Sequence, residues 1–317
     1  PNMDSLVGVG VIVNFVYSLW NTIQVFMGNT SLVHHLYFES SAIIILFVKI
    51  GRYIDKKNKD KAVDTIKNLV TITPKNGTIL KDGKELEIVQ SLAKWKRFAL
   101  AKYQIATHKG IYTDMTAIRR DDKMDETHSI YVDQWDWEKV ILKRDRTIAY
   151  LQKTVKKIVK AVCDTSKYLQ TKGFSGVDIC EDVKFITTQE LLDLYPSLTP
   201  KQREYEIVKK YKTVFIMQIG DALSDGQPHD LRAPDYDDWA LDGDLMFYHE
   251  VLDMALEISS MGIRVDKDSL VKQIEKSGKQ ERMKYAYHKM ILEDKLPLTI
   301  GGGIGQSRLC QLLLGRA

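Results

Sequence analysis

The first part of the chain carries an almost unbroken pattern of apolar residues. No Asp, Glu, Lys or Arg occurs across residues 5–38, and residues 6–27 stay apolar over roughly 20 positions, the length of a membrane-spanning helix. Residues 36–54 form a second apolar run, which Glu39 and Lys49 interrupt. Basic residues follow this run: Arg52, Lys56, Lys57, Lys59 and Lys61. The pattern predicts a membrane hairpin with its basic end in the cytoplasm; two buried core helices are the alternative.

From residue 88 onward, shorter helical and strand-like patterns alternate. Residues 146–163 repeat apolar side chains at helical spacing, which gives one apolar face. Thr187 and Glu190 have the spacing of a capping box, and Thr199-Pro200 starts a further helix with Pro at its first position. Strand-like patterns cover residues 213–219, 245–249 and 253–258. This order predicts an α+β domain with a largely antiparallel sheet.

Composition fits a chain of two ordinary domains. Of its 317 residues, 44% are hydrophobic and 28% are charged, which is close to the average for soluble proteins, and the net charge is only +4. The lysines are scattered, so we expect no nucleic-acid surface. Cys163, Cys180 and Cys310 are far apart and odd in number, which predicts reduced thiols in a cytosolic setting and argues against a zinc site.

A glycine-rich segment is the first candidate for chemistry. In "TIGGGIGQSRLCQLLL", Gly301, Gly302, Gly303 and Gly305 precede an apolar helical run whose first turn contains Arg308. Glycines permit close approach of a ligand to the backbone, and a helix N-terminus with an Arg suits phosphate or a stacked purine. The spacing matches neither a P-loop nor a dinucleotide fingerprint. A purely structural glycine turn is the alternative.

The segment "HSIYVDQWDWEKV" is the second candidate. If residues 129–138 form a strand, its period of two places one set of side chains on one face. These are Ile130, Val132, Gln134, Asp136 and Glu138. Polar groups in register between large aromatic residues favour the floor of a site, and an edge strand with one wet face is the alternative. A hairpin to the preceding strand would bring Arg119, which lies near Asp122, to the Gln134 face. Further cations stand at helical spacing: Lys94, Lys96 and Arg97.

The third candidate is acidic. The string "LRAPDYDDWALDGDLMFY" holds one arginine and five aspartates, and Glu257 follows one predicted strand later. These residues are Arg232, Asp235, Asp237, Asp238, Asp242 and Asp244. So many carboxylates need compensating cations, and hard oxygen ligands suit Mg²⁺ held together with phosphates. A solvated acidic loop is the alternative.

Together these strings resemble the ammonia-dependent asparagine synthetases across residues 88–317. "SLAKWKR", "YVDQWDWE", "LSDG", "RAPDYDDW", "SSMGIRVD" and "GGGIGQSRL" carry the resemblance. It implies the catalytic fold of class II aminoacyl-tRNA synthetases, an antiparallel sheet flanked by helices, in a cytoplasmic enzyme. The implied reaction converts ATP, aspartate and ammonia to asparagine, AMP and pyrophosphate through an aspartyl adenylate. A tRNA synthetase is a weaker alternative, because no anticodon-binding domain fits in the chain.

The resemblance also implies roles for individual residues. The cations that would act in catalysis are Arg119, Lys96 and Arg308. Aspartate would contact Ser91, Lys96, Gln134, Asp136, Arg232 and Asp237. ATP would contact Arg119, Asp122, Ser129, Val132, Gly303, Gly305 and Arg308, with Arg119 on the α-phosphate and Arg308 stacked on adenine. Asp244 and Glu257 would hold Mg²⁺.

Residues 1–87 instead resemble part of a copper-transporting P-type ATPase. The strings "MGNTSLVHHLYFESSAIIILFVKIGRYIDKK" and "AVDTIKNLVTITPKNGTILKDGKE" imply a transmembrane hairpin and the first hairpin of an actuator domain, with a tight turn at Asp82-Gly83. The C-P-C, D-K-T-G and T-G-E motifs of transport do not occur, so we expect membrane insertion through residues 6–54 at most. The ligase part begins without the family's first helix, its "G-D-G-x-Q-D"-like loop and its dimerisation strand. An inactive hybrid therefore stays open beside the ligase, and so does a membrane protein of the copper-transporting type.

Overall fold

The sequence folds into two units, residues 1–88 and 89–317, in the computed structural model, which describes residues 3–72, 79–81, 84–86, 92–118, 131–174, 177 and 179–315. The first unit holds the two apolar runs as helices α1 (Met3–Phe26) and α2 (Phe38–Ile72), joined through the short helix η1 (Thr30–His35). Two polar side chains at this junction are paired internally. The Ser18 hydroxyl accepts from the backbone N–H of Tyr37 at 2.7 Å, and the Asn21 amide donates to the carbonyl of His35 at 2.9 Å.

Most of the apolar side chains of α1 and α2 are exposed. Val16 and Leu46 are each 57% exposed, and both helices are long and apolar enough to cross a membrane. The alternative of two buried core helices is therefore wrong for this unit. After α2 come two short antiparallel strands, β1 (Ile79–Lys81) and β2 (Lys84–Leu86), as the sequence predicts. The predicted turn between them, Asp82-Gly83, lies outside the described residues.

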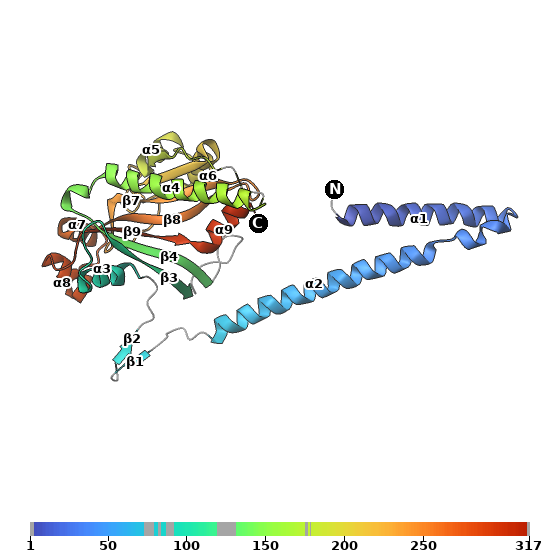
Figure 1. The fold of residues 1–317 in the computed structure, drawn as a ribbon, viewed down its shortest axis with the longest axis horizontal. Helices are drawn as coiled ribbons and strands as arrows, with labels where there is room; N and C mark the ends of the chain where they lie inside the picture. Colours follow the sequence, from blue (N-terminus) through green and yellow to red (C-terminus); the bar gives the residue numbers. More distant parts are fainter. Residues whose placement is uncertain are drawn as a thin grey trace. The chain divides into compact units, whose positions relative to one another are not determined.

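The second unit is built on a seven-stranded sheet. Its strands are β3 (Gly110–Ile118), β4 (Tyr131–Val140), β5 (Lys184–Thr187), β6 (Thr213–Met217), β7 (Asp237–His249), β8 (Met254–Arg264) and β9 (Thr299–Gly305). Their order is β3-β4-β9-β8-β7-β6-β5, and every neighbouring pair is antiparallel except β5 with β6 (Figure 1). The predicted α+β class with a largely antiparallel sheet is confirmed. The glycine segment forms the sheet strand β9 and not a turn.

Helices flank the sheet of the second unit. They are α3 (Ala93–Lys102), α4 (Ile148–Thr171), α5 (Thr188–Leu194), α6 (Pro200–Tyr211), α7 (Lys267–Lys276), α8 (Ala286–Leu292) and α9 (Gln306–Leu314), with the 3₁₀ turns η2 (Lys143–Asp145) and η3 (Gln280–Lys284). The predicted capping box of Thr187 and Glu190 starts α5, and Thr199 caps α6 with Pro200 in its first turn. Helix α4 ends at Thr171, about two turns beyond its predicted end at residue 163, so that prediction was too short.

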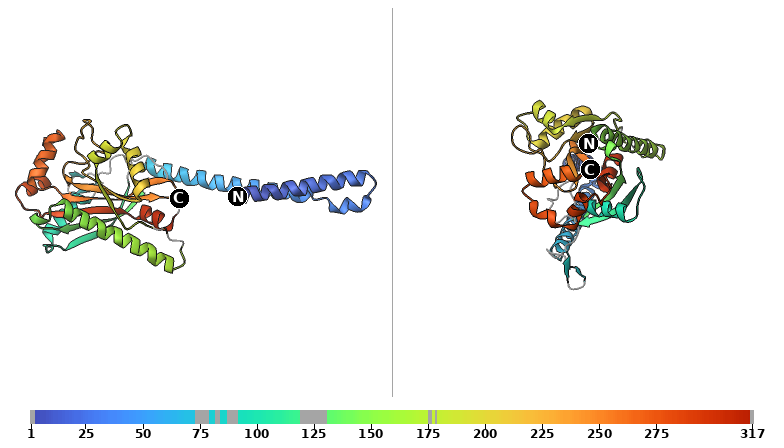
Figure 2. Two further views of the ribbon diagram at one scale, coloured as in Figure 1. Left: turned by 90° about the horizontal axis from the view of Figure 1, so that it is seen from above. Right: turned by 90° about the vertical axis from the view of Figure 1, so that its left-hand side faces the viewer.

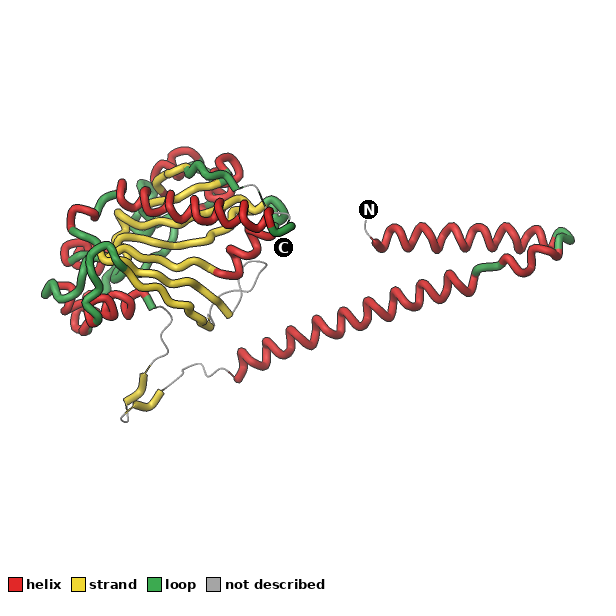
Figure 3. Tube along the Cα trace, viewed as in Figure 1, coloured by secondary structure: helices red, strands yellow, loops and turns green. Residues whose placement is uncertain are grey.

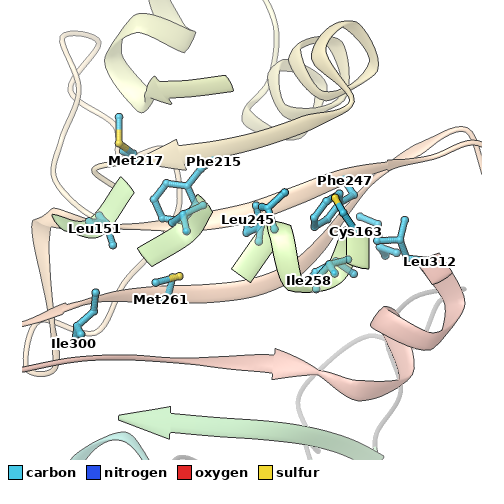
Figure 4. Close-up of a cluster of buried hydrophobic side chains, with 14 of the residues drawn as sticks. Leu151, Cys163, Phe215, Met217, Leu245, Phe247, Ile258, Met261, Ile300 and Leu312 are labelled. Atoms are coloured by element: carbon cyan, nitrogen blue, oxygen red, sulfur yellow. The ribbon is translucent and has the colours of Figure 1, made fainter. Parts of the chain in front are cut away.

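The two faces of the sheet are used differently. Helix α4 lies across one face, where Leu151 and Cys163 pack against Phe215, Leu245 and other side chains of the main core (Figures 1 and 4). Helices α5 and α6 lie on the other side of the sheet, over its β5–β6 end (Figures 2 and 3). A separate small core joins α3 to α7 and α8. The face opposite α4 therefore has helices at its ends and polar residues between them.

Candidate functional site

The strand register assembles the polar residues of four strands on one face of the sheet. Opposite pairs run from Gln134, Asp136 and Glu138 on β4 to Gly305, Gly303 and Gly301 on β9. They continue through Ser260, Gly262 and Arg264 on β8 to Asp244 and Asp242 on β7. Because side chains alternate between the faces of a strand, the residues between these positions point into the α4 core. We call this surface the site floor.

Two glycines of β9 are required by close approach of neighbouring side chains. A Cβ on Gly301 would overlap Oε2 of Glu138 and lie 2.7 Å from Nη2 of Arg264. A Cβ on Gly303 would lie 2.8 Å from Oδ1 of Asp136. Side chains of β4 and β8 thus lean over the backbone of β9. The glycines make room for buried carboxylates, a role that the sequence pattern alone did not suggest.

Lys96 of α3 reaches the floor from one end. It is 1% exposed, its Nζ lies 3.4 Å from Oδ1 of Asp136, and it donates to the carbonyl of Trp137 at 3.3 Å. Burial, and then the nearby Arg264 guanidinium, lower the pKa of Lys96 below its usual range. The structure therefore brings together Lys96 and Asp136, two residues that the resemblance assigns to aspartate.

Arg264 is the central cation of the floor, and the sequence analysis assigned it no role. Its Nη2 lies 2.8 Å from Oε2 of Glu138, its Nη1 contacts Oδ1 of Asp237, and Thr299 donates to Glu138 at 2.6 Å. Burial alone would raise the pKa of Glu138, but Arg264 outweighs it and the pKa falls. For Asp237 burial outweighs Arg264, and the pKa rises. The sequence did contain a signal for Arg264: it lies two residues after Gly262 in an alternating strand pattern, which places both on the same face of β8.

The aspartates of the acidic string are buried, so the alternative of a solvated acidic loop is wrong. Arg232 pairs with Asp244, and Arg146 pairs with Asp238 at 2.6 Å. Burial raises the pKa of Asp244 to about 7, with Arg232 offsetting part of the effect, and raises that of Asp242 well above its usual range. Oδ1 of Asp244 and Oδ2 of Asp242 are buried without a hydrogen-bond partner among the described residues.

Arg308 and Glu257 border the floor on its β9–β8 side. Gly305 is the N-cap of α9 and Arg308 lies in its first turn, as the sequence predicts. Arg308 donates to the carbonyl of Glu257 at 3.1 Å, and its guanidinium lies 3.9 Å from that carboxylate. A shift in the β7–β8 register after Leu245 pairs Glu257 with Met246, two residues from Asp244.

The donor set can be tested against the predicted Mg²⁺. Within the described part of the chain, no group of three or more acidic, His or Cys side chains has the arrangement of a metal site. The unpartnered Oδ1 of Asp244 and the carboxylate of Glu257 nevertheless supply two hard oxygens. That number fits Mg²⁺, which proteins usually hold through one or two carboxylates together with substrate phosphates.

Four predicted site residues lie outside the described residues: Ser91, Arg119, Asp122 and Ser129. Strands β3 and β4 do form the predicted antiparallel pair on either side of Arg119. Val132 is half-buried and lies on the same face of β4 as Gln134. The sequence analysis also missed a buried contact of Glu204 on α6, which lies 3.1 Å from His229.

Comparisons with known proteins show which family and which fold the chain resembles. A family model described as aspartate-ammonia ligase matches residues 47–317. Proteins named aspartate–ammonia ligase from Bacillus cytotoxicus and Bacillus cereus are 57% and 56% identical over 240 residues, which is 75% of this chain and 73% of theirs. Each of the two matches therefore covers about three quarters of this chain and of the relative. The likeness of residues 1–87 to a copper-transporting ATPase is not shown by these findings.

Solved structures share the fold. An asparaginyl-tRNA synthetase from Entamoeba histolytica, in complex with asparaginyl-adenylate, has a TM-score of 0.57 and 13% sequence identity over 76% of this chain. One from Pyrococcus horikoshii, complexed with asparaginyl-adenylate, has a TM-score of 0.53 and 13% identity over 75% of this chain. The match covers 56% of each synthetase chain. At this identity the likeness establishes the fold, and the predicted class II synthetase-like fold is confirmed.

Proposed function

Because the chain belongs to the aspartate–ammonia ligase family, whose enzymes make asparagine with ATP, we propose that the site floor carries out this reaction. An oxygen of the aspartate β-carboxylate attacks the α-phosphorus of ATP, and pyrophosphate leaves. Ammonia then attacks the activated carbonyl carbon, AMP leaves with the bridging oxygen, and the new amide nitrogen loses its excess protons. The site needs only to align two anions and to balance the growing charge.

We assign aspartate to the floor between β4 and β7. Gln134, Asp136 and Lys96 form one wall, and Arg232 and Asp237 form the other. Carboxylates suit the substrate ammonium group, while Lys96 and Arg232 suit its carboxylates. The glycines of β9 between these walls support the assignment, because they leave room for the side chains of Asp136, Glu138 and Arg264 to lie over the strand and face the floor.

ATP is assigned to the neighbouring part of the floor. Arg308 would stack on adenine beside Gly303 and Gly305, with Val132 on the opposite side of the ring. Arg119 and Asp122, with Ser129, would contact the α-phosphate region from the connection between β3 and β4. Asp244 and Glu257 would hold Mg²⁺, which would neutralise charge on the phosphates.

One observation carries this proposal: the register of β4, β9, β8 and β7 places Gln134, Asp136, Asp244 and the glycines on one face. The test is AMP release from ATP by the full chain in mild detergent, with and without aspartate and ammonium. AMP that requires both substrates, and that is lost in Arg119→Ala and Asp136→Asn, supports the proposal. Absence of turnover in a folded sample would contradict it and favour the inactive hybrid.

A second property is proposed for the first unit, namely insertion in a lipid bilayer. The exposed apolar surface of α1 and α2 and the paired polar groups at their junction support it, because unpaired polar groups are costly in lipid. The basic residues of α2 would keep the ligase unit in the cytoplasm. The full chain should float with lipid vesicles after an alkaline wash. Val16→Lys together with Leu46→Lys should leave it in the soluble fraction, and unchanged flotation of this variant would refute insertion.

We further propose that the ligase unit forms a homodimer, as the family resemblance implies. Light scattering of the detergent-solubilised chain at several concentrations measures the mass of the protein part. A mass of one chain at every concentration would refute the dimer without affecting the assignment of the reaction.

A further inference from the structure

A buried carboxylate outside the site floor joins the two walls of the aspartate site. Asp235 is 1% exposed, and its Oδ2 lies within hydrogen-bonding distance of two cationic groups and one histidine, on three different elements. These are Lys94 of α3 at 2.7 Å, Arg282 of η3 at 3.1 Å and His288 of α8 at 3.1 Å. A single oxygen thus ties α3, η3 and α8 to the segment that precedes β7.

The segment that holds Asp235 also holds one wall of the site. Arg232 comes three residues before it and Asp237 two residues after it. Each of these side chains is committed to a partner on the floor, Asp244 for Arg232 and Arg264 for Asp237. A displacement of Asp235 would therefore move both groups against their partners.

Helix α3 carries the other wall. Lys94 and Lys96 both lie in its first turn, where the positive end of the helix dipole disfavours cations. Asp235 balances Lys94, and Asp136 balances Lys96. These two carboxylates offset the unfavourable position of the two cations.

Other contacts hold the backbone in place without Asp235. Arg97 of α3 donates to the carbonyls of Pro297 and Val265, each at 2.8 Å. Gln273 of α7 donates to the carbonyls of Pro234 and Asp237 at 3.1 and 2.9 Å. The fold therefore has supports of its own in this region, beside the contacts of Asp235.

We propose that Asp235 is a positioning residue for aspartate, which sets Lys96 on one wall and Arg232 and Asp237 on the other without touching the substrate. This inference rests on the proposed function and deepens it. Loss of the charge leaves Lys94 and Arg282 close together without a counter-ion, so α3 and the segment before β7 move apart. The substrate aspartate, which spans both walls, then loses contacts with the protein. The contacts of adenine with the neighbouring part of the floor stay unchanged.

The test is aspartate-dependent exchange of labelled pyrophosphate into ATP by the full chain, which reports adenylate formation. Asp235→Asn keeps the size of the side chain and removes its charge. Asp221→Asn is the matched control, because Asp221 pairs with Lys276 in the same β6–β7 connection but is exposed. Lys94→Gln breaks the same cluster from its half-exposed side, and Lys94→Arg keeps the charge.

We expect Asp235→Asn and Lys94→Gln to raise the KM for aspartate about tenfold, the scale of one lost charge-assisted contact, while the KM for ATP stays unchanged. Lys94→Arg should restore most of the affinity, and Asp221→Asn should behave as wild type. A general structural role would instead raise both KM values to a similar extent. An unchanged KM for aspartate in both variants would overturn the proposal. Absence of exchange in the wild-type chain would overturn the proposed function itself.

Discussion

Replacing the glycines of β9 one at a time gives a graded test of the site floor. In Gly301→Ala the new Cβ would overlap Oε2 of Glu138 and lie 2.6 Å from the carbonyl of Trp137. Real Cβ atoms almost never approach below 3.0 Å, so something must move. Strand β9 cannot, because β4 and β8 hold it on both sides. The group that must yield is the Glu138 side chain, which separates from Arg264.

The magnitude follows from that separation. Glu138 is 0% exposed and Arg264 3%, so breaking their contact leaves both charges buried without full compensation. Loss of a buried ion pair costs about 3–5 kcal/mol, more than the 1–3 kcal/mol, roughly, of simple overpacking. For a domain of this size about 3 kcal/mol corresponds to a fall of about 10 °C in the unfolding temperature. We therefore expect Gly301→Ala to be severely destabilised.

Gly305→Ala is the matched control on the same strand. Its Cβ would lie 3.8 Å from the nearest atom, in Arg308, which is an ordinary contact. We expect its stability to change by no more than about 0.5 kcal/mol. Gly303→Ala should fall between them, because the end of the Asp136 side chain can shift. Urea unfolding followed by near-ultraviolet circular dichroism ranks the three variants. Equal stability of Gly301→Ala and Gly305→Ala would refute the reasoning.

Three further predictions concern single residues. Asp244 is neutral below its pKa of about 7 and anionic above it. Because the anionic form would hold Mg²⁺, kcat/KM for ATP should rise as the pH increases through about 7, and Asp244→Asn should lose this rise. Thr199→Ala removes the capping box of α6 and should cost about 1 kcal/mol in urea unfolding without changing the KM for aspartate. Arg308→Ala should raise the KM for ATP about tenfold or more, and a larger effect on aspartate would contradict the adenine assignment.

Local patterns in the sequence located most elements of the fold. The capping box at Thr187 and the Thr199-Pro200 pair placed helix starts to the residue, because such start signals depend only on neighbours in the chain. Strand lengths were less accurate: β7 begins at Asp237, although its apolar pattern predicts a strand only from residue 245. The first half of this strand is made of buried acids, which local propensity does not assign to a sheet.

The candidate site shows the same division. Alternation along one strand grouped Gln134 and Asp136 correctly, since that relation is local. Arg264 was missed because its meaning depends on Glu138 and Asp237, which lie 126 and 27 residues away. The sequence placed Asp235 only in the acidic string, because its three partners come from three other elements. Contacts between residues far apart in the chain depend on the tertiary fold, so local patterns do not predict them.

The bare strand β9 has a consequence for how such an enzyme can diverge. Substrate preference usually changes through side chains that line a pocket, but Gly301 and Gly303 are held to glycine by Glu138 and Asp136 of β4, and Gly301 also by Arg264 of β8. A new side chain there would have to appear together with a smaller residue on β4. Change is open instead at the rims, in α3 and in the segment before β7. The glycines of the floor should therefore stay constant, and new substrate specificities should arise through residues of α3 and of the segment before β7.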